Sequence, residues 1–110
     1  MRESYTAVIA RNEDWSDEWT TEPYESAWAE EAIFYIRVLS SQGAADCGTA
    51  RVQISPDGMH WADEGGAVDF RAEGGVSFLR VRNFGGWLRL RGSVAGGGKF
   101  RVMAYLTLKG

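Results

Sequence analysis

The sequence predicts an all-β fold, an antiparallel β-sandwich of about eight or nine short strands, with a jelly roll as one possible form and a closed barrel as the alternative. Apolar and polar residues alternate with period two along much of the chain, whereas helical periodicity is poor. Glycine is frequent and proline rare, with 14 and 2 residues, which favours many tight turns. Five Trp, four Tyr and five Phe provide the side chains of a compact core. At 110 residues the chain is expected to form one domain, residues 1–110.

Segments with strand periodicity are separated by turn signals. The expected strands are Tyr5–Ala10, Tyr24–Glu30, Ala32–Ser40, Thr49–Ser55, Met59–Asp63, Ala67–Arg71, Val76–Asn83, Trp87–Gly92 and Lys99–Lys109. Residues Gln42–Gly48 are expected to form a loop, and the three glycines at 96–98 a flexible turn. The last strand shows the clearest alternation, and its predicted core face is Phe100, Val102, Ala104, Leu106 and Leu108.

The composition argues against most catalytic and cofactor-dependent functions. The only histidine, His60, and the only cysteine, Cys47, cannot build a usual zinc site or an internal disulfide. No phosphate-binding glycine motif is present, so we expect no cofactor and no enzyme activity. Net charge is −3 and only two of the 12 basic residues are Lys, which disfavours nucleic acid as a partner. No secretion signal or membrane-spanning run is visible, so the expected location is the cytoplasm or a virion, without membrane contact.

Charge is divided unevenly between the two halves of the chain. Residues 1–50 hold 10 acidic and 3 basic residues, and residues 51–110 hold 5 acidic and 9 basic residues. In one interpretation the two halves neutralise each other within one domain. In the other, an acidic surface on one copy meets a basic surface on a second copy.

Residues 11–23 form an acidic stretch that contains Trp15 and Trp19 and ends at Pro23. We expect this stretch to be a long loop or arm. Its two Trp side chains either cap the end of the sandwich or dock on another subunit while the acidic residues contact arginines there.

The stretch from Arg51 to Trp61 predicts a hairpin that turns at Asp57-Gly58, with Trp61 as a core residue. Its Ser-x-Asp-Gly-x-x-Trp pattern resembles hairpins of small β-sandwich modules, such as discoidin-like and immunoglobulin-like domains and virion proteins of tailed bacteriophages. The resemblance extends over about 60 residues, from Thr49 to the end, and implies hairpin geometry rather than an activity. Discoidin domains are usually longer, secreted and closed by disulfides. This sequence shows none of these features, which favours an intracellular or virion protein.

A second predicted hairpin turns around Gly85-Gly86 and is rich in arginine. Alternation places Leu79, Val81, Leu88 and Leu90 on the core face. The opposite face carries Phe78, Arg80, Arg82, Trp87, Arg89 and Arg91. A two-residue turn would pair Arg82 with Arg89 and Arg80 with Arg91, whereas a four-residue loop would pair Arg80 with Arg89. Either register opposes like charges, which acids of the same chain, a neighbouring copy or an anionic ligand would have to offset.

The sequence therefore predicts a non-catalytic structural protein that self-associates as a homo-oligomer through an Arg/Trp face and the acidic aromatic arm. A virion or virion-like assembly is its expected setting. Another structural protein is a further candidate partner. The alternative is a β-sandwich module that binds a carbohydrate or another ligand on exposed Trp side chains. The candidate interface or ligand residues are Trp15, Trp19, Arg80, Arg82, Phe84, Trp87, Arg89 and Arg91.

Overall fold

The computed structural model describes residues 3–43, 47–72 and 75–110, with the side chains of 95 and 96 left out. Its regular elements are all strands: β1 (Ser4–Thr20), β2 (Tyr24–Glu25), β3 (Glu31–Gln42), β4 (Cys47–Ser55), β5 (Ala62–Arg71), β6 (Val76–Arg82) and β7 (Trp87–Lys109). Every strand pairing is antiparallel, which confirms the predicted all-β antiparallel class. Within the described residues no helix could cross a membrane.

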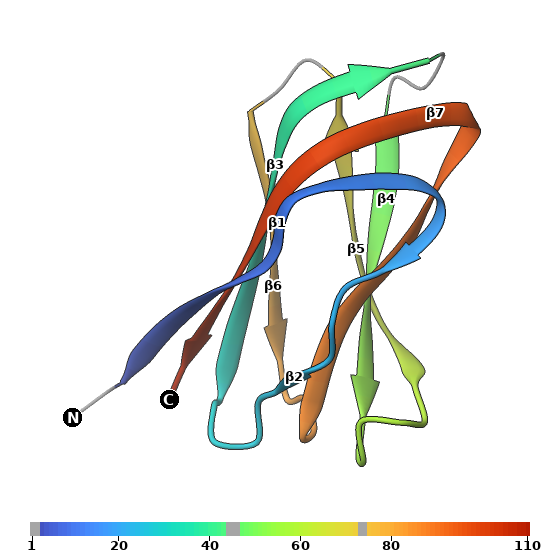
Figure 1. The fold of residues 1–110 in the computed structure, drawn as a ribbon. Helices are drawn as coiled ribbons and strands as arrows, with labels where there is room; N and C mark the ends of the chain where they lie inside the picture. Colours follow the sequence, from blue (N-terminus) through green and yellow to red (C-terminus); the bar gives the residue numbers. More distant parts are fainter. Residues whose placement is uncertain (1–2, 44–46, 73–74) are drawn as a thin grey trace.

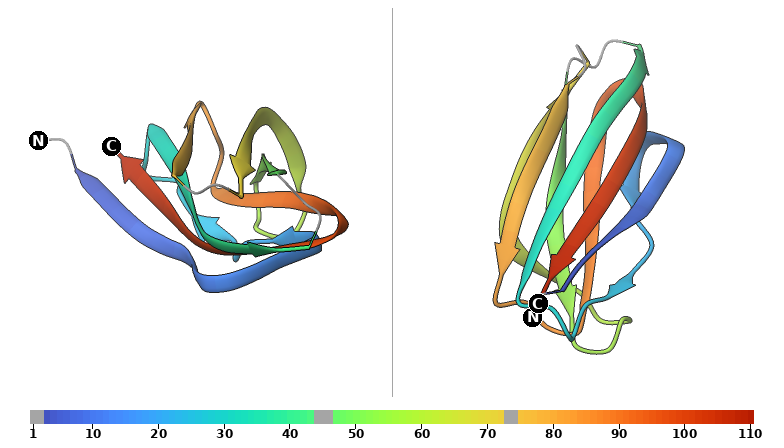
Figure 2. Two further views of the ribbon diagram at one scale, coloured as in Figure 1. Left: turned by 90° about the horizontal axis from the view of Figure 1, so that it is seen from above. Right: turned by 90° about the vertical axis from the view of Figure 1, so that its left-hand side faces the viewer.

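The strands form one sheet that bends into two layers (Figures 1 and 2). The order is β5-β4-β7-β3-β6, and β1 and β2 pair with β7 away from this path. The first part of β7 pairs with β4, and its last part, Lys99–Lys109, pairs with β3. The outermost strands of this order, β5 and β6, come into contact. The sandwich is therefore nearly closed, like a barrel.

The structure has fewer and longer strands than expected. The two predicted strands Trp87–Gly92 and Lys99–Lys109 are parts of β7, which turns the corner between the layers without a loop. Gly97 allows this, because its φ of 73° lies in the left-handed region that glycine tolerates. Similarly, β5 runs through Gly65 (φ 114°) and joins the end of the predicted strand Met59–Asp63 to the predicted strand Ala67–Arg71. The expected loop Gln42–Gly48 lies partly outside the described residues, at 44–46.

The core lies between the layers and follows the predicted alternation. Phe100, Val102, Ala104, Leu106 and Leu108 have no exposed surface. The core face predicted for the arginine-rich segment is also correct, since Val81, Leu88 and Leu90 are buried and Leu79 packs against them. Burial of these apolar side chains is the main driving force for this fold.

The expected loop or arm at 11–23 is wrong for most of its length, because β1 continues through Thr20. Register shifts interrupt the pairing of β1 with β7 around Ala10 and between Ser16 and Asp17. Asn12 and Asp17 each adopt a φ of 50°, a conformation that Asn and Asp tolerate better than most residues. These bulges break the period-two pattern, which is why the sequence did not indicate a strand here.

Candidate functional site

The two tryptophans expected on an arm are core residues. Trp15 and Trp19 retain only 2% and 8% of their surface. Their rings stack on each other and make T-shaped contacts with Phe70. Among the described side chains, their indole nitrogens are buried without a hydrogen-bond partner. Neither ring is presented to a ligand or a second subunit, so docking of Trp15 and Trp19 on another copy is not compatible with this fold.

The predicted arginine hairpin does not form, because β6 and the first part of β7 belong to different layers. β6 pairs with β3, and β7 begins beside β4. None of the expected arginine pairs is adjacent in the sheet. Arg82 lies opposite Glu31, and Arg80 lies opposite Ile33. The connection through Asn83, with its φ of 57°, crosses from one layer to the other instead of making a tight turn.

The four candidate arginines have contacts within the chain. Arg82 makes an ion pair with Glu31 at 3.3 Å, and Arg91 one with Glu18 at 3.8 Å. The Arg80 guanidinium lies 5.1 Å from the Phe78 ring centroid. Exposed ion pairs of this kind contribute at most about 1 kcal/mol each to stability. They neutralise part of the charge asymmetry between the two halves of the chain.

Arg89 is the centre of a polar cluster on the outer face of the β4–β5–β7 layer. Its Nε donates to Gln53 Oε1 at 2.8 Å, and Gln53 Nε2 donates to Asp63 at 3.0 Å. Its guanidinium also stacks 4.2 Å above the Trp61 ring. Burial, followed by the charge of Arg91, lowers the pKa of Arg89. These contacts connect side chains of the neighbouring strands β7, β4 and β5, so the cluster stabilises the sheet.

Trp61 was expected in the core, and this is wrong. The register pairs Gln53 with Asp63, whose side chains lie on the outer face. Trp61 has the same parity as Asp63 and is half-buried on that face, beneath Arg89. The hairpin prediction itself is correct, since β4 pairs with β5 across this turn.

The remaining aromatic candidates are also partly covered. Phe84 is half-buried and packs against the core. Trp87 is half-buried, and a Cβ built on Gly58 would lie 3.1 Å from its ring. The Asp57 turn therefore folds over Trp87, which leaves little of that ring as a platform.

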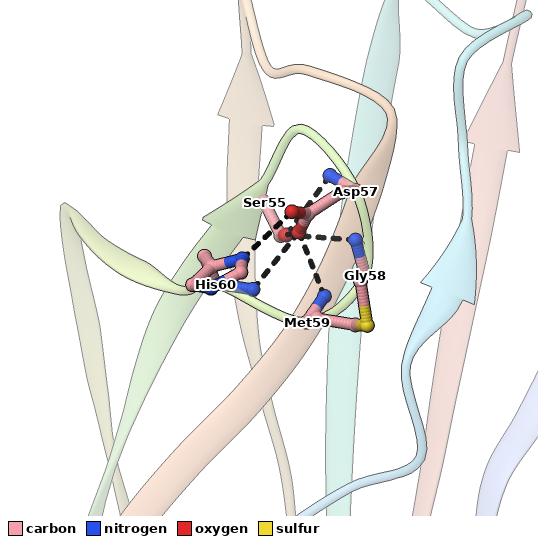
Figure 3. A network of polar contacts seen from close by, with 5 residues as sticks. All are labelled: Ser55, Asp57, Gly58, Met59 and His60. Carbon is pink, nitrogen blue, oxygen red and sulfur yellow. Dashed lines mark hydrogen bonds and ion pairs between the residues drawn. The ribbon is translucent and has the colours of Figure 1, made fainter.

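The turn after β4 is held by a fan of hydrogen bonds on Asp57 (Figure 3). Asp57 Oδ1 accepts from the backbone N–H groups of Met59 and His60 at 2.8 and 2.9 Å, and from Ser55 Oγ at 3.0 Å. Asp57 Oδ2 pairs with His60 Nδ1 at 2.7 Å. These donors, led by His60, hold the pKa of Asp57 well below its ordinary value. Ser55 and His60 both hydrogen-bond to the Asp57 carboxylate and so stabilise the turn. In a Ser–His–Asp triad, by contrast, the serine hydroxyl bonds to the histidine ring.

The outer face of the β6–β3–β7–β1 layer carries an apolar surface that was not predicted from the sequence. In this layer Phe78 lies opposite Tyr35, Tyr35 opposite Tyr105, and Tyr105 opposite Val8. We call this row of four adjacent side chains the outer belt. Phe78 is 50% exposed and Val8 38%, while the two tyrosines are half-buried. The sequence signal was Ile33-Phe34-Tyr35-Ile36, a strand segment that is apolar on both faces.

The outer belt has apolar neighbours and a charged surround. Val76, which is 60% exposed, lies two residues before Phe78 on β6, and Met103 lies two residues before Tyr105 on β7. The charged residues of the same face include Arg37, Arg80, Arg82, Glu31 and Lys109. An apolar centre with a charged rim is the usual composition of a protein–protein contact surface.

The described residues contain no group of three or more His, Cys, Asp or Glu side chains arranged to hold a metal ion. A surface cavity of about 720 Å³ lies between the start of β1 and β2. Tyr5, Tyr24 and Trp28 provide its aromatic walls. None of the sequence-predicted site residues lines it.

Comparison with known protein families gives no match, and neither does comparison with curated protein sequences. Solved structures do share the fold. PBSX exported protein XepA aligns with a TM-score of 0.61 at 13% identity, over 98% of this chain and 36% of XepA. The SPBc2 prophage-derived protein YomS aligns with a TM-score of 0.60 at 5% identity, over 100% of this chain and 96% of YomS. Murine APRIL aligns with a TM-score of 0.60 at 10% identity, over 99% of this chain and 98% of APRIL.

These similarities define the class of the protein as an antiparallel β-sandwich. The chain spans about a third of XepA and nearly all of YomS. The resemblance to small β-sandwich modules, proteins of phage origin among them, is thus confirmed at the level of the fold.

Proposed function

We propose that this chain is a non-catalytic assembly module that self-associates through the outer belt. The observation that carries the proposal is the uninterrupted row Phe78–Tyr35–Tyr105–Val8, which crosses all four strands of one layer. An exposed apolar strip of this kind is unusual on the outer face of an antiparallel sandwich, where polar residues normally face water.

A second copy of the chain is the partner that this surface favours. In a two-fold arrangement the same patch faces itself, so an apolar row meets an apolar row and the charged rim encloses the contact. Tyr and Phe supply much of the binding energy in such contacts, because they bury a large area with few rotatable bonds. Arg80 and Arg82 are then rim residues rather than the centre of the interface.

A phage-derived setting is consistent with this proposal. XepA and YomS, which share the fold, are described as a PBSX exported protein and a prophage-derived protein. We therefore favour a virion or virion-like assembly as the place where the module works, in the cytoplasm during assembly or in the finished particle. The outer belt replaces the acidic arm of the sequence-based hypothesis as the surface that makes the contact.

The test is the mass of the purified protein by light scattering after size exclusion, over a range of concentrations. Wild-type protein is expected to form a defined oligomer, and Phe78→Glu is expected to yield the 12.2 kDa monomer. Met59→Glu is the matched control, because Met59 is 73% exposed but lies in the Asp57 turn, away from the belt. A monomeric wild type at all concentrations, or a Phe78→Glu variant with wild-type mass, would overturn the proposal.

A further inference from the structure

The cavity between the start of β1 and β2 is a candidate ligand site distinct from the outer belt. It lies where the start of β1 runs beside the end of β7 (Figure 2). Here the Gly110 N–H donates to the Glu3 carbonyl at 3.0 Å. Tyr5 and Trp28, on its walls, are 54% and 44% exposed. Its volume of about 720 Å³ is within the range of small-molecule sites in proteins.

The aromatic walls are fixed by backbone contacts. Tyr5 lies opposite Leu108 and Tyr24 lies opposite Leu88, so both rings project from paired strands of the sheet. The loop that carries Trp28 is held at Ser26, whose N–H donates to the Gly86 carbonyl at 2.7 Å. A site that is ordered before binding loses less conformational entropy when a ligand enters.

Trp28 has a support of its own. Gly110 lies against the six-membered ring of the indole, where a Cβ at that position would come within 3.1 Å of the ring. The Ala29 N–H donates to the Ser26 carbonyl at 3.1 Å, which closes a turn around Trp28. The ring is thus supported by backbone on one side while 44% of the side chain stays open to solvent.

The described lining of this cavity is acidic and aromatic. Glu3 and Glu25 contribute carboxylates, and no described Lys or Arg side chain lines the cavity. Carboxylates only accept hydrogen bonds, and the faces of aromatic rings carry partial negative charge. Partial burial is the largest cause that raises the pKa of Tyr24. The hydrogen bond to Tyr5, the charge of Tyr5 and the charge of Glu25 raise this pKa further, in decreasing order. The cavity therefore disfavours additional negative charge.

We propose that this cavity binds an organic cation, with an ammonium or guanidinium group placed between the aromatic rings and the two carboxylates. Cation–π contact with Trp and Tyr, together with charge-assisted hydrogen bonds, recognises this chemical group. A lysine or arginine side chain of a partner protein and a free amine both carry it. A neutral sugar, the ligand of the alternative sequence-based hypothesis, has no positive charge for these walls to recognise.

The test follows the Trp28 indole N–H signal in ¹H–¹⁵N NMR spectra during titration at low salt. The signal is assigned by its loss in Trp28→Phe. The first probe is N-acetyl-arginine amide, and its neutral isostere N-acetyl-citrulline amide is the matched control ligand. Tetramethylammonium chloride represents a small free cation, and cellobiose represents a neutral sugar. The arginine and tetramethylammonium probes are expected to shift the signal with saturation, and the two neutral probes are not.

Variants separate the proposed site from general effects of charge. Trp28→Ala is expected to weaken arginine binding by about threefold to thirtyfold, followed on backbone signals around Tyr5 and Tyr24. The double variant Glu3→Gln and Glu25→Gln is expected to weaken it at least as much. Glu25→Gln keeps an oxygen that can accept from the Ala27 N–H, a contact of 3.1 Å, so the loop should stay folded. Glu13→Gln, on an exposed part of β1, is the matched control for lost negative charge.

Each alternative outcome contradicts the proposal. Equal binding of citrulline and arginine would show that the positive charge is not recognised. Saturable binding of cellobiose without binding of the cations would assign a sugar site instead. Absence of shifts with all probes would exclude the site. The two cationic probes also distinguish where the bound cation comes from. Tetramethylammonium binding as strong as that of the arginine probe points to a free amine. Preference for the arginine probe points to a side chain of a partner protein. Binding should persist in the Phe78→Glu variant, because the cavity lies apart from the outer belt.

Discussion

The indole rings of Trp15 and Trp19 stack with centroids 3.6 Å apart and planes inclined by only 6°. They lie at the bend of the sheet, on a strand that pairs with both parts of β7. Phe70 makes T-shaped contacts with both indoles, at 5.5 and 6.2 Å between centroids. This group of rings fills one end of the space between the layers.

Gly92 makes the position of this stack possible. A Cβ on Gly92 would collide with the Thr49 carbonyl oxygen and with the Trp19 ring. Because the obstacles are backbone and a buried ring, neither can move aside cheaply. We expect Gly92→Ala to lower the free energy of unfolding by about 1–3 kcal/mol, measured by urea denaturation.

The matched control for Gly92 is Gly85→Ala. A Cβ on Gly85 would meet only the Ser55 carbonyl, at an ordinary contact distance of 3.7 Å. The two variants add the same methyl group, so they separate crowding from the general effect of replacing glycine. Equal stability of both would contradict the close packing of Gly92 on Trp19.

Replacing Trp19 by smaller residues should show how the size of its side chain affects the free energy of unfolding. Trp19→Ala is expected to lower the free energy of unfolding by about 3–5 kcal/mol, because it leaves a large cavity. Trp19→Phe should cost much less, because it keeps most of the ring and removes an indole N–H that is buried without a partner. Denaturant unfolding compares the two. A Phe variant as unstable as the Ala variant would mean that the indole nitrogen has a partner in solution.

The fold could be predicted from the sequence where the alternation of side chains is regular. The inward residues of β7, such as Phe100 and Leu106, follow period two and are fully buried. The pattern failed at β1, because the register shifts around Ala10 change the inward parity from even at Ala10 to odd at Trp15 and Trp19. It also failed for β6 and β7, where alternation fixed the faces of Val81 and Leu88 but contained no information on which strands pair.

The candidate sites were harder to predict for the same reason. The outer belt joins Phe78, Tyr35, Tyr105 and Val8 from four strands, and only the register brings them into one row. The cavity is lined by residues within 3–5 and 23–28, which come before and after most of the segment 11–23 that the sequence predicted to be a loop or arm. Long-range pairing determines such surfaces, whereas local pattern determines only which side of each strand is apolar.

The Asp57 turn should depend on the charge of its carboxylate. Asp57→Asn is expected to lower the melting temperature at pH 7, because the backbone N–H groups of Met59 and His60 lose a charged acceptor. The folded state lowers the pKa of Asp57 from its ordinary value of 3.8. The stabilisation is therefore complete above pH 3.8 and is lost only as the pH falls further, through the lowered pKa.

Thermal melts of wild type and Asp57→Asn across pH 2–7 measure this dependence. The gap between their melting temperatures should stay constant down to about pH 4 and narrow at lower pH. Asp17→Asn is the control, since Asn tolerates the φ of 50° at that position. A gap that closes between pH 6 and 4 would contradict the lowered pKa of Asp57.

Arg89 should be required for stability in a way that lysine cannot replace. Its guanidinium both donates to Gln53 and stacks on Trp61. Lysine lacks the planar fork that makes both contacts at once. We expect Arg89→Lys to cost about 1 kcal/mol in urea unfolding, whereas Arg71→Lys, at the exposed end of β5, should cost almost nothing. Equal effects of the two changes would show that the cluster contributes only charge.

The salt dependence of association distinguishes the outer belt from the arginines around it. Arg82 makes an exposed ion pair with Glu31 at the rim, and such pairs weaken as the Debye length falls to about 3 Å in 1 M salt. We expect Arg82→Glu to change the dissociation constant of the oligomer by less than about fivefold at 0.15 M salt, and not at all in 1 M salt. Phe78→Glu should abolish association at both concentrations, because it places a charge in the apolar row. Sedimentation velocity measures all three proteins under both conditions. If Arg82→Glu dissociates the oligomer and 1 M salt does the same to the wild type, then charge rather than the apolar row holds the copies together.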